Sequence, residues 1–213
     1  MGEIDLYADQ KKKEQIANRK FIRVFTIDQQ PWDNYYKADV SSKVELSYDK
    51  HFLYLKFISI EPKIEAKYRG YNGNVHEDSC VEFFVRFDDD MSYYNLEVNM
   101  MGNIKMAYGK DRFSRTFLSI DTLKQIERSV LIEPIVQDDK LYLEWNIDLK
   151  IPTGIFTYNN VLCLENHKIF GNFYKCGGGL KQPDYLCWNH IMSDEPDFHR
   201  PEFFKLIHES KEI

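Results

Sequence analysis

The sequence predicts an all-β protein, an antiparallel β-sandwich of roughly ten strands. Three observations lead to this fold class. Short runs with an apolar residue at every second position recur along the 213 residues, and that period turns one face of each strand toward a core. Turn-forming Asp, Asn, Gly and Ser residues separate the runs at short spacing. The 15 Phe, 14 Tyr and 3 Trp residues enrich the chain in side chains that favour strands.

The elements follow from these signals in chain order. Residues 8–20 lack Gly and Pro, and we expect either a short helix or a solvated extension there. Two hairpins come next, 43–48 with 52–60 and 79–87 with 93–100, joined by the polar turns DKH and DDDMS. Further strands are predicted at 103–108, 129–136, 141–147, 161–166, 171–176, 185–191 and 202–208.

The charge balance argues against a nucleic-acid-binding protein. The chain has 28 Lys and Arg residues against 34 Asp and Glu residues, a net charge of −6, whereas phosphate backbones are bound by basic surfaces. No apolar run is long enough to span a membrane. The first residues also lack a signal-peptide core, which predicts a cytoplasmic chain as written, or a secreted or periplasmic one if a leader was trimmed.

Domain organisation and cysteine usage are simple. No linker or internal repeat interrupts the chain, so residues 1–213 are expected to form one domain. The four cysteines, Cys80, Cys163, Cys176 and Cys187, have no CxxC spacing. They are predicted to be reduced and to pack as small hydrophobic residues, and a disulfide is left open as the alternative. The sequence does not predict an oligomeric state.

The second predicted hairpin is expected to carry polar side chains on one face. A register that pairs Phe87 with Tyr94 and Glu82 with Asn99 sets apolar residues opposite apolar residues. The other face then gathers hydrogen-bonding side chains around Phe84. These are Glu82, Arg86, Asn95, Glu97 and Asn99. A solvated sheet face with a Glu–Arg pair would show the same pattern.

Three other roles fit individual residues. Glu82 and Glu97 are candidate carboxylates of a glycoside hydrolase, whose chemistry depends on a separation that the sequence does not contain. His76 and His199 are candidate ligands of a haem-binding sandwich. The acidic turns DDD and QDD are compatible with calcium, although Asp also favours hairpin turns for backbone reasons. No other cofactor is predicted.

Three stretches together resemble the family 9 carbohydrate-binding modules, in particular their stand-alone bacterial relatives. These stretches are HEDSCVEFFVRF with YYNLEVN (76–87 and 93–99), GNFYKCGGG with YLCWNHI (171–179 and 185–191), and PDFHRPEFF (196–204). The likeness extends from about Trp32 to Leu206. The resemblance implies a β-sandwich that binds a saccharide between two aromatic rings, with no catalytic residue.

The resemblance also implies which residues bind. It places His76 and Phe198 where the family typically carries Trp, and it places Glu82 and Asn99 at hydrogen-bonding positions. We therefore expect a pocket with His76 on one side, a Phe-His-Arg run on the other and a polar floor, while Trp188 belongs either to the same site or to the core. The predicted binding residues are His76, Glu82, Glu97, Asn99, Trp188, Phe198, His199 and Arg200.

Overall fold

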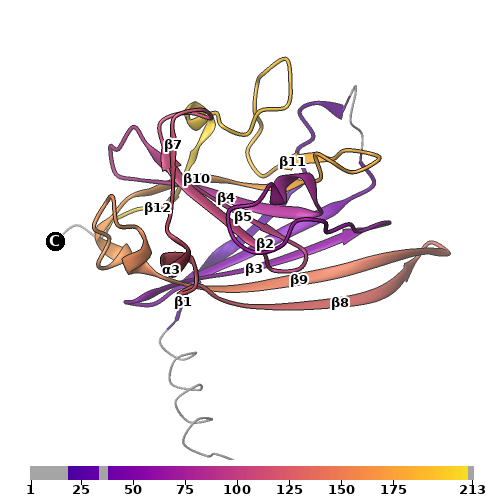
Figure 1. The fold of residues 1–213 in the computed structure, drawn as a ribbon, viewed down its shortest axis with the longest axis horizontal. Coiled ribbons are helices and arrows are strands. Elements are labelled where there is room, and N and C mark those ends of the chain that lie inside the picture. The colour runs from indigo at the N-terminus through magenta and orange to yellow at the C-terminus, as the bar shows by residue number, and fades with distance from the viewer. Residues whose placement is uncertain (1–18, 34–37, 211–213) are drawn as a thin grey trace, which may run out of the picture.

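Two antiparallel sheets make up the protein (Figure 1). The computed structural model describes residues 19–33 and 38–210, apart from the side chains of Phe21 and Ile22. The five-stranded sheet has the order β1-β2-β3-β9-β8, formed by Lys20–Ile27, Ser41–Tyr48, Phe52–Glu61, Lys140–Pro152 and Glu127–Gln137. The seven-stranded sheet has the order β11-β10-β4-β5-β6-β7, formed by Tyr185–Cys187, Ile169–Cys176, Cys80–Phe87, Tyr93–Asn99, Ile104–Gly109 and Arg115–Phe117. Its remaining strand, β12 (Lys205–His208), pairs with β10.

The main hydrophobic core lies between the two sheets. Strand β4 contributes Val81, Phe83 and Val85, and strand β9 contributes Trp145 and Ile147. All five side chains are at most 1% exposed. Apolar residues alternate along the strands because every second side chain points into this core. The predicted all-β sandwich is confirmed.

Several strand predictions need correction. Residues 161–166 form no strand. They contain a 3-10 turn at Leu164–Asn166, and the side chains of Val161 and Leu164 are buried in the core. Strand β11 ends at Cys187 rather than at 191. Strands β1 and β7 were not predicted, because the first has no clean alternation and the second has three residues.

Helical structure is scarce in the described part of the chain. It comprises one short helix, α3 (Ile120–Leu123), and 3-10 turns at Val75–Glu77, Thr153–Ile155, Leu164–Asn166 and Pro201–Phe203. The helix predicted near the N-terminus falls mostly outside the described residues, whereas Lys20 already begins β1. None of the helices in the described ranges is long and apolar enough to cross a membrane.

The register of β4 and β5 differs from the predicted one by two residues. The strands are antiparallel neighbours as expected, but Glu82 lies opposite Glu97 and Cys80 lies opposite Asn99. A two-residue shift keeps every side chain on its own face, so hydrophobic alternation does not distinguish the two registers. In the observed register the last pair of the two strands is Val85 with Tyr94, and Asp88 in the connecting turn adopts a positive φ of 50°.

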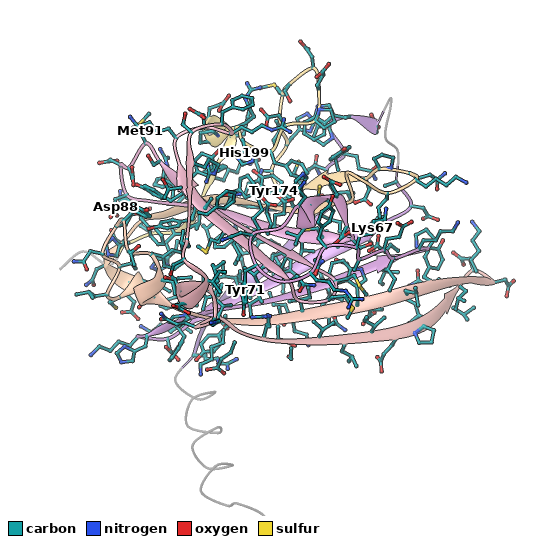
Figure 2. The ribbon with its side chains drawn as sticks, in the orientation of Figure 1. Lys67, Tyr71, Asp88, Met91, Tyr174 and His199 are labelled. Carbon is teal, nitrogen blue, oxygen red and sulfur yellow. The ribbon has the colours of Figure 1, made fainter. Side chains whose placement is uncertain are left out.

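A second apolar cluster covers the outer face of the seven-stranded sheet. Phe84 of β4, Tyr93 of β5 and Tyr174 of β10 pack there against Phe198 and Phe204 of the C-terminal segment. Figure 2 shows Tyr174 and His199 on the side of this sheet that faces away from β8 and β9. The C-terminal segment, yellow in Figure 1, thus crosses the outer face of the sheet and leaves some polar side chains of that face accessible.

Candidate functional site: a pocket on the outer face

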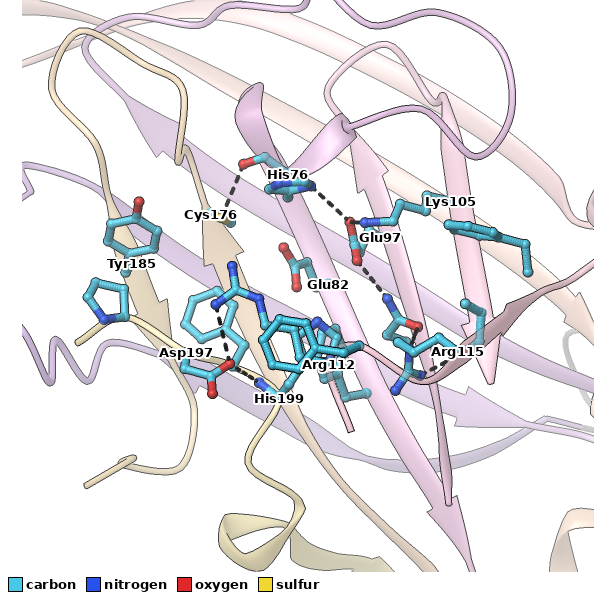
Figure 3. A pocket seen from close by; sticks show the side chains of 17 residues that line it. His76, Glu82, Glu97, Lys105, Arg112, Arg115, Cys176, Tyr185, Asp197 and His199 are labelled. Carbon is cyan, nitrogen blue, oxygen red and sulfur yellow. Dashed lines mark hydrogen bonds and ion pairs between the residues drawn. The ribbon is translucent and has the colours of Figure 1, made fainter. Parts of the chain in front are cut away.

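A pocket of about 280 Å³ opens on this outer face (Figure 3). Residues directly opposite one another in antiparallel strands point to the same side, so β4, β5 and β6 build its floor in rows. One row is Glu82, Glu97 and Lys105, and the next is Phe84, Asn95 and Ala107. The floor is therefore polar along one row and mixed along the other.

Glu97 is the ionised carboxylate of the floor. It is 2% exposed; its Oε1 accepts a hydrogen bond from Asn95 Nδ2 at 2.7 Å, and its Oε2 accepts one from Lys105 Nζ at 3.0 Å. His76 Nδ1 lies 3.6 Å from the same Oε2. Burial alone would raise the pKa of Glu97, but His76 and Lys105 outweigh it and hold the pKa below its ordinary value.

Glu82 is the carboxyl group of the pair that favours its protonated form. It is 3% exposed and lies directly opposite Glu97 on the neighbouring strand. Burial, followed by repulsion from Glu97, raises the pKa of Glu82 well above its ordinary value. The floor thus offers a carboxylic acid that can donate a hydrogen bond beside a carboxylate that can accept one.

Aromatic side chains line two parts of the pocket. Phe198 comes from the C-terminal segment and stacks on Tyr174, with ring centroids 4.1 Å apart and an interplanar angle of 12°. Tyr185 of β11 lines the same pocket. Phe113 and Phe117 come from the chain around β7, and their side chains are 91% and 54% exposed. Polar groups at the floor and rings at the edges are typical of a pocket for a small organic ligand.

His199 is held as a neutral ring. Its Nδ1 lies 2.8 Å from the Tyr93 hydroxyl, and burial, assisted by the charge of Arg115, lowers the pKa of His199 to about 3. One ring nitrogen is therefore engaged with a neighbouring side chain. No group of three or more His, Cys, Asp or Glu side chains within residues 19–33 and 38–210 is arranged to hold a metal ion.

Arg115 fastens the pocket wall rather than offering donors to a ligand. Its Nε donates to Asn95 Oδ1 at 2.9 Å, and its two terminal nitrogens donate to four backbone carbonyls. These carbonyls belong to Tyr93, Ala107, Gly109 and Asp111. All five guanidinium N–H groups are thus used within the protein.

The structure brings five of the eight predicted binding residues together. The residues that line the pocket are His76, Glu82, Glu97, Phe198 and His199. Their roles in binding stay predictions. The other three, Asn99, Trp188 and Arg200, lie outside the lining of this pocket.

Each of these three side chains has partners elsewhere. Asn99 is buried, and its Nδ2 donates to Asp78 Oδ2 at 2.8 Å and to the carbonyl of Tyr68. Trp188 packs edge-on against Phe25 of the main core at 4.8 Å. Arg200 Nε donates to Glu202 at 2.6 Å.

Sequence reasoning did not identify several lining residues. They include Lys105, Arg112, Phe113, Arg115, Phe117, Cys176, Tyr185 and Asp197. Lys105 lies in a predicted strand, and the correct register would have placed it beside Glu97. The residues from 110 to 117 carry no strand or motif signal, so only the contact between their loop and the sheet reveals them.

The carboxyl pair predicts a pH dependence of stability. Since the folded pKa of Glu82 is raised, this carboxyl group keeps its proton to a higher pH in the native state than in the unfolded state, and its contribution to stability is lost as pH rises from 4.5 through the folded pKa. Glu82→Gln removes this proton, so its stability is expected to fall less steeply, by up to about 1.4 kcal/mol per pH unit. Urea unfolding of both proteins between about pH 5 and pH 8 measures the difference. Parallel profiles would contradict the assignment of the proton to Glu82.

Comparison with known protein families identifies one match. The model of carbohydrate-binding family 9 matches residues 11–208. A crystal structure from Bacteroides uniformis, of a protein whose proposed role is carbohydrate binding, is 29% identical, with a TM-score of 0.76 over 94% of this chain and 90% of that one.

Two family 9 modules from Caldicellulosiruptor kristjanssonii are more distant. The complex with cellotriose is 10% identical, with a TM-score of 0.45 over 88% of this chain and 77% of that one. The complex with glucose is 12% identical, with a TM-score of 0.48 over 97% of this chain and 87% of that one. No curated protein matches the chain.

Proposed function

Because this chain belongs to carbohydrate-binding family 9, we propose that its outer-face pocket binds a saccharide without transforming it. The match over residues 11–208 confirms the family that the sequence motifs predicted. The observation that carries the proposal is the pair of Glu82 and Glu97 on the pocket floor.

The pair matches the hydrogen-bonding chemistry of a sugar. Each saccharide hydroxyl both donates and accepts, and the floor supplies a protonated Glu82 beside an ionised Glu97. A carboxylate accepts at about four lone-pair positions, and Asn95 and Lys105 occupy two of those of Glu97. His76 Nδ1 lies 3.6 Å from Oε2 as well. We expect the remaining acceptor position of Glu97 and the acid proton of Glu82 to bind neighbouring hydroxyls.

The charges of the pocket favour an uncharged ligand. Lys105 is paired with Glu97 at 3.0 Å, and Arg112 lies 4.0 Å from Asp197. The donors of Arg115 are all used by the protein. No ionised group at the floor therefore requires a ligand of opposite charge.

The rings supply the second half of saccharide recognition. The C–H faces of a sugar are apolar and pack on flat aromatic surfaces. Tyr185 offers such a surface beside the polar floor, and the edge of Phe198, which is 8% exposed and stacked on Tyr174, borders the same pocket. The smaller rings at His76 and Phe198, in place of the Trp that the family resemblance implies, predict weaker stacking than an indole pair would provide.

Binding without turnover is favoured over hydrolysis. Glycoside hydrolases also place two carboxyl groups in a sugar site, and the differing protonation of Glu82 and Glu97 would suit an acid and a base. The family, however, consists of non-catalytic binding modules. This favours the simpler role for the pair.

Calorimetry across a panel of mono- and oligosaccharides tests the proposal. We expect heat of binding for at least one neutral saccharide, with no new reducing ends after prolonged incubation. Release of reducing ends would favour the hydrolase. An absence of binding heat across the panel, with the protein folded, would refute saccharide binding.

A further inference from the structure

The loop between β6 and β7 presents an exposed ring at the mouth of the pocket. Phe113 is 91% exposed, yet it lines the pocket together with the buried Glu82 and Glu97. A side chain that is nearly all in solvent and also borders the cavity lies at its opening. Large apolar side chains exposed beside a pocket mark surfaces that a ligand covers.

This loop is rigidly built although its tip is exposed. Asp111 Oδ1 accepts hydrogen bonds from the backbone N–H groups of Phe113 and Ser114 at 2.8 and 2.7 Å. These bonds lower the pKa of Asp111, so its carboxylate stays ionised. The backbone on either side of Phe113 is therefore fixed before any ligand arrives, which reduces the entropic cost of binding against it.

The base of the loop is equally constrained. Arg115 donates to the carbonyls of Gly109 and Asp111 in the loop, and to those of Tyr93 and Ala107 in the sheet. A Cβ at Gly109 would lie 2.2 Å from the carbonyl oxygen of Ser114, so the two ends of the loop approach as closely as glycine allows. Phe113 is thus attached through Arg115 to the strands that carry the pocket floor.

The pocket itself is small. Its volume of about 280 Å³ lies just below the range of roughly 300–1,000 Å³ usual for small-molecule sites. The buried polar groups lie at its floor, whereas Phe113 and the 54% exposed Arg112 lie at its mouth. A ligand that reaches the floor and is longer than the pocket is deep would extend past these two side chains.

We infer that the site takes a saccharide of at least two units, the inner unit bound at Glu82 and Glu97 and the next unit stacked on Phe113. This inference rests on the proposed function and adds the length of the ligand and the residue that contacts its second unit. Phe113 offers its ring face to the C–H surface of the outer sugar, and Arg112 offers donors to its hydroxyls. Specificity for length then resides in a loop separate from the floor.

Matched pairs of a monosaccharide and its disaccharides test this assignment. The probes are glucose with cellobiose and maltose, mannose with mannobiose, and xylose with xylobiose, each titrated calorimetrically into wild type and Phe113→Ala. We expect one disaccharide to bind wild type about two- to tenfold more tightly than its monosaccharide, the range of one aromatic contact. Phe113→Ala should abolish that advantage and leave the affinity for the monosaccharide unchanged.

The control is Leu162→Ala, which truncates another strongly exposed apolar side chain, 72% exposed and outside the pocket lining. It should bind every probe as wild type does. Equal affinity of wild type for both members of every pair overturns the inference, as does a Phe113→Ala variant that keeps the advantage or weakens both probes alike. In those cases saccharide binding stands. Absence of binding for all probes overturns the proposed function and the inference with it.

Discussion

Replacing Lys175 by Met is expected to lower the free energy of unfolding by about 3–5 kcal/mol, the usual cost of removing one member of a buried ion pair. Lys175 is 0% exposed, and its Nζ lies 2.9 Å from Asp184 Oδ1 and 3.3 Å from Glu61 Oε2. Burial alone would lower the pKa of Lys175, but Asp184 and Glu61 outweigh it and raise the pKa above its ordinary value. The ammonium therefore stays charged, and Met would leave two buried carboxylates without their cation.

The position of this cluster explains the size of the expected loss. Lys175 belongs to β10 of the seven-stranded sheet, whereas Glu61 belongs to β3 of the five-stranded sheet. Glu61 also accepts a hydrogen bond from Trp145 Nε1 at 2.6 Å. Lys175 thus joins the two layers through carboxylates that are at most 2% exposed.

Urea unfolding of wild type and Lys175→Met measures the loss. Lys124→Met is the matched control, because Lys124 is 59% exposed and forms an ion pair with the exposed Asp121, so its loss should stay below about 1 kcal/mol. Adding Glu61→Gln and Asp184→Asn to Lys175→Met should recover part of the stability. A Lys175→Met protein as stable as the Lys124→Met control would show that the cluster contributes little.

Replacing Glu97 by Gln is expected to weaken saccharide binding by roughly ten- to 150-fold, the equivalent of about 1.5–3 kcal/mol for a hydrogen bond to a charged group. Gln keeps the shape of the side chain but removes the negative charge. It also leaves Lys105, which is 16% exposed, without its partner at 3.0 Å. The acceptor that the proposed ligand needs most is thereby lost.

Calorimetry with the best-binding saccharide of the panel measures this effect, and thermal unfolding verifies that the variant is folded. Glu133→Gln is the control, since Glu133 lies on the exposed strand β8 outside the pocket lining. Its affinity should equal that of wild type. A Glu97→Gln protein that binds within twofold of wild type would mean that the ligand does not contact this carboxylate.

The predictions from sequence succeeded where a local pattern decides the structure. Alternation in residues 81–87 placed Val81 and Phe83 in the core and Glu82 on the outer face, as the structure has them. The same alternation did not decide the register, because Glu82 opposite Asn99 and Glu82 opposite Glu97 satisfy it equally. Only the structure shows that Glu82 lies opposite Glu97, with a turn between the strands in which Asp88 adopts a positive φ of 50°.

Some residues of the candidate site were likewise predicted from the sequence, and others were revealed only by the structure. His76, Phe198 and His199 were proposed from motifs, and they converge because the C-terminal segment crosses the outer face of the sheet. Phe113 and Arg115 had no motif to indicate them. They reach the pocket through a loop whose position depends on hydrogen bonds to distant strands, and sequence spacing does not encode such bonds.

The sequence by itself determined the all-β sandwich, the family and the polar character of one sheet face, because alternation, turn residues and motifs are local properties of the chain. The tertiary structure alone decided that Glu97 faces Glu82, that Asn99 bonds to Asp78 and that Phe113 stands at the pocket mouth. The physical reason is that strand register and loop position are selected by the total free energy of packing and hydrogen bonding. Those contributions come from residues far apart in the chain, and no short stretch of sequence contains them.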